Sequence, residues 1–162
     1  MQAAELPKLA DCAVVPLDLW KTKSGLEVLR ELVAGRLPPP PMAGLIGFNL
    51  IEVDEGVAVF AGTPGFQHYN PAGAVHGGYA AALLDSCMTC SIQTTLPAGT
   101  GVTTLEYKIN LVRAMTKDTG PVRAEGKMIH PGKRTATAEG RIIDSQGRLL
   151  AHGTTTCFVF PL

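Results

Sequence analysis

Hydrophobic and small residues dominate the middle of the chain. Residues 79–96 are almost all Ala, Leu, Cys, Met, Thr, Ser and Ile, and neither glycine nor proline occurs between Gly78 and Pro97. A run of this length and composition predicts a largely buried helix of about five turns. Asp85 is the one formally charged side chain in residues 56–105. The pattern therefore places a single carboxylate in the middle of a buried helix.

Segments of alternating hydrophobic and polar residues flank this helix on both sides. Before it, residues 46–55 and 57–65 meet at an Asp-Glu-Gly turn and predict a β-hairpin. After it, four segments separated by residues typical of turns predict four more antiparallel strands. These segments are residues 103–114, 122–130, 134–144 and 149–160. Two strands, one long helix and four strands form an α+β plan, in which a curved antiparallel sheet can wrap one apolar helix.

The N-terminal part has a different pattern. Residues 1–23 show little periodicity and are expected to form a loosely packed arm. Ser24 is a suitable N-cap, and the leucines and valine that follow it at helical spacing predict a short amphipathic helix. Residues 37–41, with four consecutive prolines, predict a stiff extended linker. We therefore divide the chain into an arm, helix and linker over residues 1–43 and one folded domain over residues 44–162.

The composition excludes some kinds of partner. The chain has 14 basic and 14 acidic side chains and no net charge, so neither a nucleic acid nor a membrane surface is expected as a partner. Hydrophobic residues make up 46% of the chain and charged residues 17%, which indicates that much of the surface is hidden in an oligomer. The N-terminus lacks the pattern of a secretion signal, and no apolar run is long enough to span a bilayer. We therefore expect a cytoplasmic protein.

The four cysteines predict neither a disulfide framework nor a metal site. They are few and scattered, at positions 12, 87, 90 and 157. Cys87 and Cys90 form a C-x-x-C pair, but the pair lies within the predicted helix, without the second pair or nearby histidine of a zinc site. We interpret both as buried packing residues and expect no bound metal.

The buried carboxylate is a candidate catalytic group. An unpaired carboxylate in an apolar interior is costly, so it is normally paired, protonated or functional. A solvated face, or hydrogen bonds to backbone amides, would explain Asp85 equally well on its own. Gly77 and Gly78 favour a functional role, because at a helix start they leave outward-pointing amides at the positive end of the helix dipole. Such amides suit an oxyanion or a polarised carbonyl group, although two glycines also permit a tight turn.

The spacing of these groups has a consequence for assembly. Eight residues separate Gly77 from Asp85, about 12 Å of rise along a helix. An oxyanion donor and a base must both lie about 3 Å from one reacting centre, so one copy of the helix cannot supply both. Two antiparallel helices related by a twofold axis would bring Gly77 of one chain to Asp85 of the other. If both groups are catalytic, we expect the site to be shared between two chains.

A motif around the helix resembles a known family. Asn70, the triplet His76-Gly77-Gly78 and Asp85, nine residues after the histidine, resemble the signature of the hotdog-fold acyl-CoA thioesterases, in their PaaI-like, phenylacetate-degradation branch. The resemblance continues through residues 101–110, 131–133 and 144–151 and covers roughly residues 44–160. It implies an α+β hotdog fold, a curved antiparallel sheet of about six strands wrapped around one long central helix. It also implies a thioester hydrolase that acts on aryl- or short- to medium-chain acyl-CoA, with coenzyme A as part of the substrate and no other cofactor.

The resemblance further implies roles for individual residues. Asp85 would activate a water molecule as general base or attack the thioester as nucleophile. The Gly77 amide would stabilise the oxyanion, with Gly78 beside it in contact with the substrate. His76 would hold the substrate carbonyl or the loop. Asn70 would orient the water or contact the thioester, unless it only forms an Asn-Pro turn.

Three threonines are further candidates. Thr104 matches a hydroxyl residue that positions the water in this family, but Thr103 beside it makes the assignment ambiguous by one. Thr89 lies one helical turn beyond Asp85, and this spacing alone makes it a substrate-binding candidate. Threonine is also a good strand former, so each of these residues has a structural explanation as well.

Coenzyme A carries phosphates, so a basic spot is expected near the mouth of the pocket. Arginine and lysine bind phosphate well. The candidates are Arg113, His130, Lys133 and Arg134. A charged hairpin tip is also common on any soluble sheet, which is the alternative explanation.

Other interpretations of the motif exist. The same fold can serve as a non-catalytic, regulatory acyl-CoA-binding protein, although binding alone does not need a buried acid. The hydratase branch of the fold has a histidine five residues after its aspartate, where this chain has Cys90. The acyl group is not determined, nor is the choice between a homodimer and a homotetramer. Five apolar residues either line an acyl pocket or form the core: Phe66, Tyr79, Leu83, Leu84 and Met88.

Overall fold

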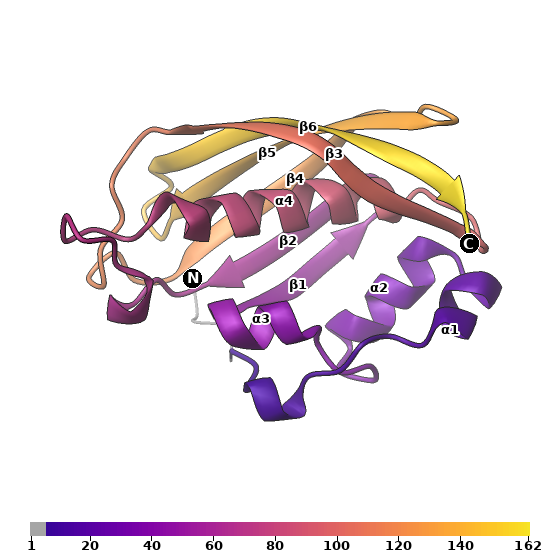
Figure 1. The fold of residues 1–162 in the computed structure, drawn as a ribbon, viewed down its shortest axis with the longest axis horizontal. Coiled ribbons are helices and arrows are strands. Elements are labelled where there is room, and N and C mark those ends of the chain that lie inside the picture. The colour runs from indigo at the N-terminus through magenta and orange to yellow at the C-terminus, as the bar shows by residue number, and fades with distance from the viewer. Residues whose placement is uncertain (1–5) are drawn as a thin grey trace.

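A curved, six-stranded antiparallel sheet wraps around one long helix in the computed structural model, which describes residues 6–162 (Figure 1). The helix is α4 (Gly77–Gln93). The strands are β1 (Phe48–Asp54), β2 (Val57–Gly62), β3 (Thr100–Leu111), β4 (Val122–His130), β5 (Thr135–Asp144) and β6 (Leu149–Pro161). Their order across the sheet is β1-β2-β4-β5-β6-β3, so β1 and β3 are the two edge strands. The predicted α+β class and hotdog fold are confirmed.

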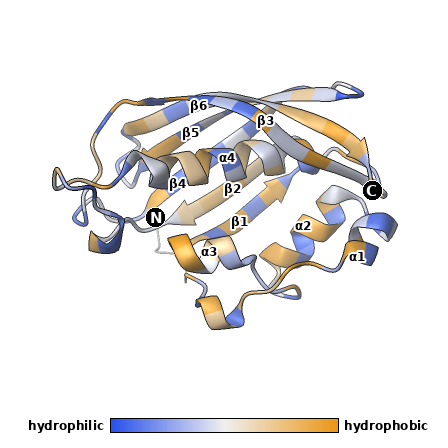
Figure 2. Ribbon diagram, in the orientation of Figure 1, coloured by the Kyte–Doolittle hydropathy of each residue, from blue (hydrophilic) through white to orange (hydrophobic). Residues whose placement is uncertain are grey.

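The predicted strands agree closely with the observed ones. β4 has the predicted bounds, and β5 and β6 each differ from the prediction by one residue at one end. β3 begins three residues earlier than predicted, at Thr100, and ends at Leu111. In Figure 2, β1 alternates between hydrophilic and hydrophobic colours, as expected of a strand with one buried face.

Two glycines allow α4 to lie directly on the sheet. Gly126 of β4 and Gly140 of β5 are partners in register. A Cβ atom at Gly126 would lie 2.0 Å from the carbonyl oxygen of Cys87, and one at Gly140 would lie 2.8 Å from Cγ of Met88. The obstacle at Gly126 is backbone, so a side chain fits there only if the helix moves. These glycines therefore fix how close α4, and with it Asp85, lies to the sheet.

One face of α4 forms the centre of the core. Leu83, Leu84 and Met88 have no exposed surface, and Tyr79 is 3% exposed, whereas Phe66 is 74% exposed on the loop before the helix. The four residues on α4 are thus core residues, the second of the two roles predicted for them.

The N-terminal part contains more helix than predicted. The predicted amphipathic helix is α2 (Gly25–Val33), and Ser24 and Glu27 form a capping box at its start. Two short helices, η1 (Leu9–Asp11) and α1 (Leu17–Thr22), lie within the segment predicted to be a loose arm. Residues 1–5 of that arm lie outside the described part of the chain.

The expected extended linker is wrong at its C-terminal end. Pro41 begins a further helix, α3 (Pro41–Ile46), and β1 therefore starts at Phe48 rather than at Ile46. Proline fits the first position of a helix, where its missing N–H is not needed. Gly47 ends the helix with φ +76°, in the left-handed conformation that glycine adopts readily.

The remaining short element, η2 (Phe66–His68), lies in the loop between β2 and α4. None of the helices in residues 6–162 is both long and apolar enough to cross a membrane.

Candidate active site

Two threonine hydroxyls lie beside the carboxylate of Asp85, which is half-buried and is the ninth residue of α4. The Thr104 hydroxyl, on β3, donates a hydrogen bond of 2.7 Å to Asp85 Oδ1. The Thr89 hydroxyl, one turn further along α4, lies 2.9 Å from that of Thr104 and 3.4 Å from Oδ1. Both hydroxyls use Oδ1, and no residue in 6–162 donates a hydrogen bond to Oδ2. The second carboxylate oxygen is therefore the one that a water molecule or a substrate can approach.

Thr103 and Thr104 differ in direction, although they are neighbours on β3. Thr104 faces α4, whereas Thr103 is exposed. The ladder between β3 and β6 has an irregularity between Thr104 and Glu106, which interrupts the regular alternation of side chains. Of the two threonines, Thr104 is the one whose hydroxyl contacts Asp85.

A cleft of about 290 Å³ opens beside Asp85. Its polar lining comes from α4 and β3, and most of its apolar lining comes from β1, β2 and the segment around α3. The polar residues are Asp85, Ser86, Thr89, Thr103 and Thr104. The apolar residues are Pro40, Met42, Phe48, Phe60, Cys90 and Val102. The cleft thus combines one carboxylate with an apolar chamber, the arrangement that suits a ligand with a reactive polar end.

Cys90 is not a competing nucleophile in this cleft. It keeps some exposed surface but is closely surrounded by protein atoms. Burial and, to a smaller extent, the charge of Asp85 raise the pKa of its thiol to about 12. The thiol is therefore protonated near neutral pH, and a protonated thiol is a poor nucleophile. Burial likewise raises the pKa of Cys87, whose side chain packs in the core.

The N-terminus of α4 presents one unpaired amide. His76 is the N-cap residue, and its Nδ1 accepts a hydrogen bond of 2.8 Å from the Gly78 amide. The Tyr79 amide donates to the His76 carbonyl oxygen at 3.0 Å. The Gly77 amide finds no acceptor within residues 6–162. Of the two predicted glycine donors, Gly77 is available at the positive end of the helix, and Gly78 is already bound to the cap.

Asn70 begins a tight turn over residues 70–74, in the loop before α4. Its Oδ1 accepts hydrogen bonds from the amides of Ala72 at 2.9 Å and Ala74 at 3.2 Å. These bonds are those of a turn-forming asparagine, the alternative role considered for this residue. They leave the side-chain NH2 group as the part of Asn70 that can face a ligand.

Within one chain, the four predicted phosphate-binding residues do not form a single cluster. Arg113 follows the end of β3, near the N-terminus of α4, where a Cβ atom on Gly77 would lie 2.7 Å from Leu111 Cδ1. The other three, His130, Lys133 and Arg134, lie on the β4–β5 turn, near the C-terminal end of α4. The 17 residues of α4 separate these two places, a length of about 25 Å.

Arg134 is the member of this group with a clear contact toward the cleft. Its guanidinium lies 6.0 Å from the centre of the Phe158 ring, a cation–π distance. Phe158 pairs with Thr103 across the β3–β6 ladder, and Thr103 lines the cleft. The β4–β5 turn is thus closer to the Thr103 end of the cleft than Arg113 is.

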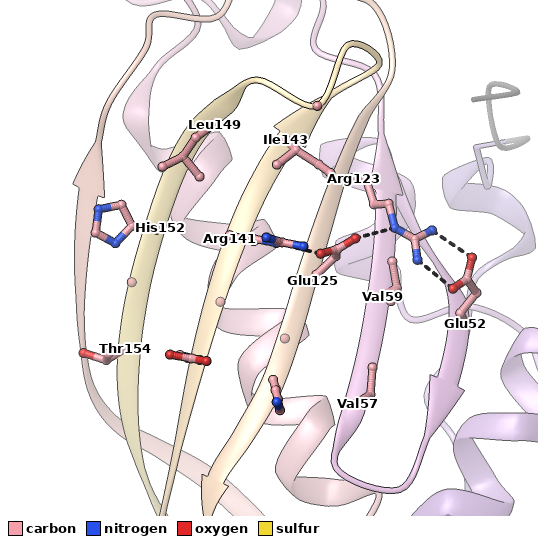
Figure 3. A pocket seen from close by; sticks show the side chains of 16 residues that line it. Glu52, Val57, Val59, Arg123, Glu125, Arg141, Ile143, Leu149, His152 and Thr154 are labelled. Atoms are coloured by element: carbon pink, nitrogen blue, oxygen red, sulfur yellow. Dashed lines mark hydrogen bonds and ion pairs between the residues drawn. The ribbon is translucent and has the colours of Figure 1, made fainter.

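A larger hollow, of about 800 Å³, lies on the opposite face of the sheet (Figure 3). Figure 3 shows its side chains in front of the strands, with α4 behind them. Arg123 donates to both carboxylate oxygens of Glu52, at 2.8 and 2.6 Å, and to Glu125 at 2.8 Å. Arg141 donates to the other oxygen of Glu125 at 2.8 Å. The hydrogen bonds from Arg123 lower the pKa of Glu52, so these groups remain charged and paired to one another.

The larger of the two hollows is not the one with the more reactive groups. The larger one holds a network of compensating charges, and the smaller one holds a carboxylate with an unoccupied oxygen. We assign the candidate active site to the smaller cleft, because reactivity requires a group that is not already engaged. Within residues 6–162, no group of three or more His, Cys, Asp or Glu residues is placed to hold a metal ion.

Several cleft residues were not predicted from the sequence. Phe48 and Phe60 lie in strands, and hydrophobicity alone does not distinguish a core position from a pocket position. Ser86 follows Asp85 directly but has no distinguishing spacing. Pro40 and Met42 lie in the segment interpreted as a linker. The signal for a helix in this segment was the pair Pro41 and Gly47, because proline is common at the first position of a helix and glycine at its end.

Comparison with known proteins gives consistent matches. Residues 72–151 match the family model of the thioesterase superfamily. A 1,4-dihydroxy-2-naphthoyl-CoA hydrolase of Listeria monocytogenes is 29% identical over 114 residues, which are 70% of this chain and 91% of that enzyme. The region that the family model matches includes His76, Gly77, Gly78 and Asp85.

Solved structures share the fold. The PaaI protein of the Escherichia coli phenylacetic acid degradation operon has a TM-score of 0.73 with this chain. The two are 21% identical, and the match covers 85% of this chain and 96% of that one. A phenylacetic acid degradation-related protein of Ralstonia eutropha has a TM-score of 0.72, with 26% identity over 80% of this chain and 98% of that one. Part of this chain therefore has no counterpart in either structure. The chain thus has the hotdog fold, and the family match over residues 72–151 together with these relatives supports a PaaI-like thioester hydrolase.

Proposed function

We propose that this protein hydrolyses acyl-CoA thioesters in the cleft beside Asp85. The observation that carries the proposal is the carboxylate itself, which is held through Oδ1 by the Thr104 hydroxyl and open at Oδ2. It lies at the edge of an apolar chamber that suits an acyl group. The similarity to a naphthoyl-CoA hydrolase supports coenzyme A as the thiol part of the substrate. Aryl and short- to medium-chain acyl groups are the proposed range.

The proposed reaction needs a base, or a nucleophile, and an oxyanion donor. As general base, Asp85 takes a proton from a water molecule whose oxygen attacks the thioester carbon. As nucleophile, Asp85 attacks that carbon directly, and water then hydrolyses the resulting anhydride. In both routes the C–S bond breaks and coenzyme A leaves as a thiolate, which takes up a proton. Thr104 and Thr89 orient the carboxylate.

The oxyanion donor comes from a second chain in this proposal. The Gly77 amide is eight residues from Asp85 on the same helix, about 12 Å of rise. β3 is an edge strand of 12 residues, and an unpaired edge is a template for pairing with another strand. Its exposed residues include Leu105 at 59% and Leu111 at 57%, which a partner chain would cover.

Pairing β3 with its copy about a twofold axis supplies the missing donor. Along one chain, Thr104 lies beside Asp85 and Leu111 lies beside Gly77, so β3 runs antiparallel to α4. A twofold axis near the middle of the paired strands would bring the Thr104 end of one chain to the Leu111 end of the other. Gly77 of the partner subunit would then approach Asp85, twice per homodimer. A homotetramer would contain two such pairs.

The residues around the helix start have supporting roles in the proposal. His76 fixes the helix N-terminus through Nδ1, so its Nε2–H is left to contact the substrate carbonyl group. Gly78 keeps the backbone open at that place. Asn70 holds the loop and offers its NH2 group to the water or the thioester. Lys133 and Arg134, with His130, are the proposed phosphate contacts at one end of the cleft, and Arg113 is proposed for the other end.

The test is release of free coenzyme A thiol from a panel of aryl, short-chain and medium-chain acyl-CoAs. We expect Asp85→Asn to lower kcat by about 100- to 10,000-fold, the usual contribution of a positioned base, while acyl-CoA binding persists. Asp118→Asn is the matched control, because Asp118 is an exposed carboxylate in an ion pair with Lys117. Tight acyl-CoA binding without turnover by the unmodified protein would instead identify a non-catalytic acyl-CoA-binding protein.

A single turnover in H2¹⁸O separates the two routes for Asp85. A nucleophilic carboxylate keeps one ¹⁸O atom after the anhydride is hydrolysed at the aspartyl carbon, whereas a general base leaves all the ¹⁸O in the released acid.

A further inference from the structure

We propose that α3 forms the outer wall of the acyl pocket and that Met42 limits the acyl group to a compact, aromatic one. This inference rests on the proposed function, because it names the class of substrate that the same cleft would accept. It gives a role to α3, in which none of the proposed catalytic residues lies.

The position of Asp85 fixes the direction in which an acyl group would extend. The thioester carbon must lie within reach of the carboxylate, at the edge formed by α4 and β3. The rest of the acyl group then has the apolar part of the cleft to occupy. That part is lined by Met42 and Pro40 on one side and by Phe48 and Phe60 of the sheet on the other.

The wall is held firmly in place from two directions. Toward the core, Ala43 is 1% exposed and packs in the hydrophobic cluster. On the outer side, a Cβ atom at Gly44 would lie 2.8 Å from Leu9 Cα, so η1 packs directly on α3. The Ala13 amide also donates a hydrogen bond of 3.0 Å to the Pro39 carbonyl oxygen. In Figure 1, α3 lies next to β1 on the side of the sheet that holds α4.

The volume of the chamber favours a ring over a long chain. An apolar cavity of about 150 Å³ is enough to bind benzene. The cleft, at about 290 Å³, is roughly twice that size and so matches one ring or two fused rings. A long alkyl chain would have to leave the chamber past α3.

The lining favours an aromatic group as well. The rings of Phe48 and Phe60 both line the cleft and pack edge to face against each other, with their centres 5.7 Å apart and their planes at 73°. An aromatic ligand gains from such edge-to-face contacts beyond the area that it buries. The thioether of Met42 makes a favourable contact with a ring, and the flexible side chain adapts to its shape.

Met42 is suited to a test because its side chain is accessible. The residue is 48% exposed, so a substitution there changes the outer wall without opening the core. Alanine would shorten the wall and open the chamber toward solvent, and tryptophan would fill part of it. Leu45 is the matched control, since it lies on the same helix, is 67% exposed and does not line the cleft.

The experiment compares kcat/KM for benzoyl-CoA, naphthoyl-CoA and lauroyl-CoA in the unmodified protein and in Met42→Ala, Met42→Trp and Leu45→Ala. We expect Met42→Ala to raise the ratio of lauroyl-CoA to naphthoyl-CoA hydrolysis about tenfold, a typical size for one altered pocket contact. Met42→Trp should lower naphthoyl-CoA hydrolysis more than benzoyl-CoA hydrolysis. Leu45→Ala should leave all ratios unchanged.

The possible failures are distinguishable. If the unmodified protein is active but both Met42 variants keep its ratios, or Leu45→Ala shifts them equally, then α3 does not select the acyl group. If the unmodified protein prefers lauroyl-CoA to both aromatic substrates, the compact-ring proposal is wrong. If it releases coenzyme A from none of the three, the proposed function itself fails.

Discussion

The two hollows of this protein lie on opposite faces of one sheet and differ in whether their charges are engaged. On the outer face, Arg123 and Arg141 bind Glu52 and Glu125 in a continuous network, and the hollow around them is about 800 Å³. On the inner face, a cleft of about 290 Å³ holds Asp85, with one oxygen that no residue in 6–162 contacts. A reactive site is therefore better identified by an unengaged polar group beside an apolar chamber than by the volume of the hollow alone.

After the loss of Asp85 itself, the largest expected effect concerns the proposed oxyanion donor. Gly77→Pro removes one N–H group, and proline is well accepted at the first position of a helix. His76, with φ −59° and ψ 138°, already has the extended conformation required before a proline. We expect kcat to fall about 100- to 1,000-fold, as when one oxyanion donor is lost.

Measuring the thermal midpoint of Gly77→Pro beside its kcat controls for folding. Unchanged activity in a folded variant would contradict the role of this amide.

The next effect concerns the hydroxyl that holds Asp85. Thr104→Val keeps the branched shape but removes the hydrogen bond to Oδ1. A hydrogen bond to a charged group contributes about 1.5–3 kcal/mol, so we expect kcat/KM to fall roughly 10- to 100-fold. Thr154→Val is the matched control, because Thr154 lines the hollow on the outer face. An equal loss of kcat/KM in Thr104→Val and Thr154→Val would contradict the assignment of the active site to the inner face of the sheet.

A third prediction concerns stability rather than turnover. Gly126→Ala introduces a Cβ atom toward the Cys87 carbonyl oxygen, which forces α4 away from the sheet. Overpacking of this kind costs about 1–3 kcal/mol of unfolding free energy, which chemical denaturation measures. At Gly65 the nearest atoms belong to the Gln67 side chain, which can move, so Gly65→Ala should cost less. A reversed order would contradict the close packing of α4.

The smallest effect is expected on the outer face. Arg141→Met removes an ion pair with Glu125 from a side chain that is 62% exposed. Exposed pairs contribute about 0.2–1 kcal/mol, so stability should change little. We expect kcat/KM to stay within about twofold of the unmodified protein. A loss comparable to that of Thr104→Val would show that the outer hollow takes part in the reaction.

The sequence predicted the elements whose pattern is periodic. The buried helix with Asp85 and the strands were found because alternation and helical spacing survive in the chain. α3 was missed because a run of prolines is typical of an extended segment, and here the last of them begins a helix.

The contacts within the site were harder to predict than its residues. Asp85, Gly77 and His76 became candidates through their spacing and through the family resemblance, and their catalytic roles stay predictions. The choice between Thr103 and Thr104 depended on strand alternation next to an irregularity in the ladder, which one sequence does not reveal. The gap between Arg113 and the β4–β5 turn depends on how β3 and β4 lie along α4, which is a property of the tertiary fold.

The central claim is that Asp85 of one chain works with Gly77 of its partner, and mixed dimers test it directly. Chains carrying Asp85→Asn and chains carrying Gly77→Pro, each inactive alone, are combined through different affinity tags and purified as heterodimers. A shared site predicts that each heterodimer regains one intact site, with Asp85 from the Gly77→Pro chain and Gly77 from the Asp85→Asn chain. Activity per dimer should then recover to about half that of the unmodified homodimer, because one of the two sites in a twofold dimer is restored. Heterodimers that stay as inactive as either parent would contradict the shared site.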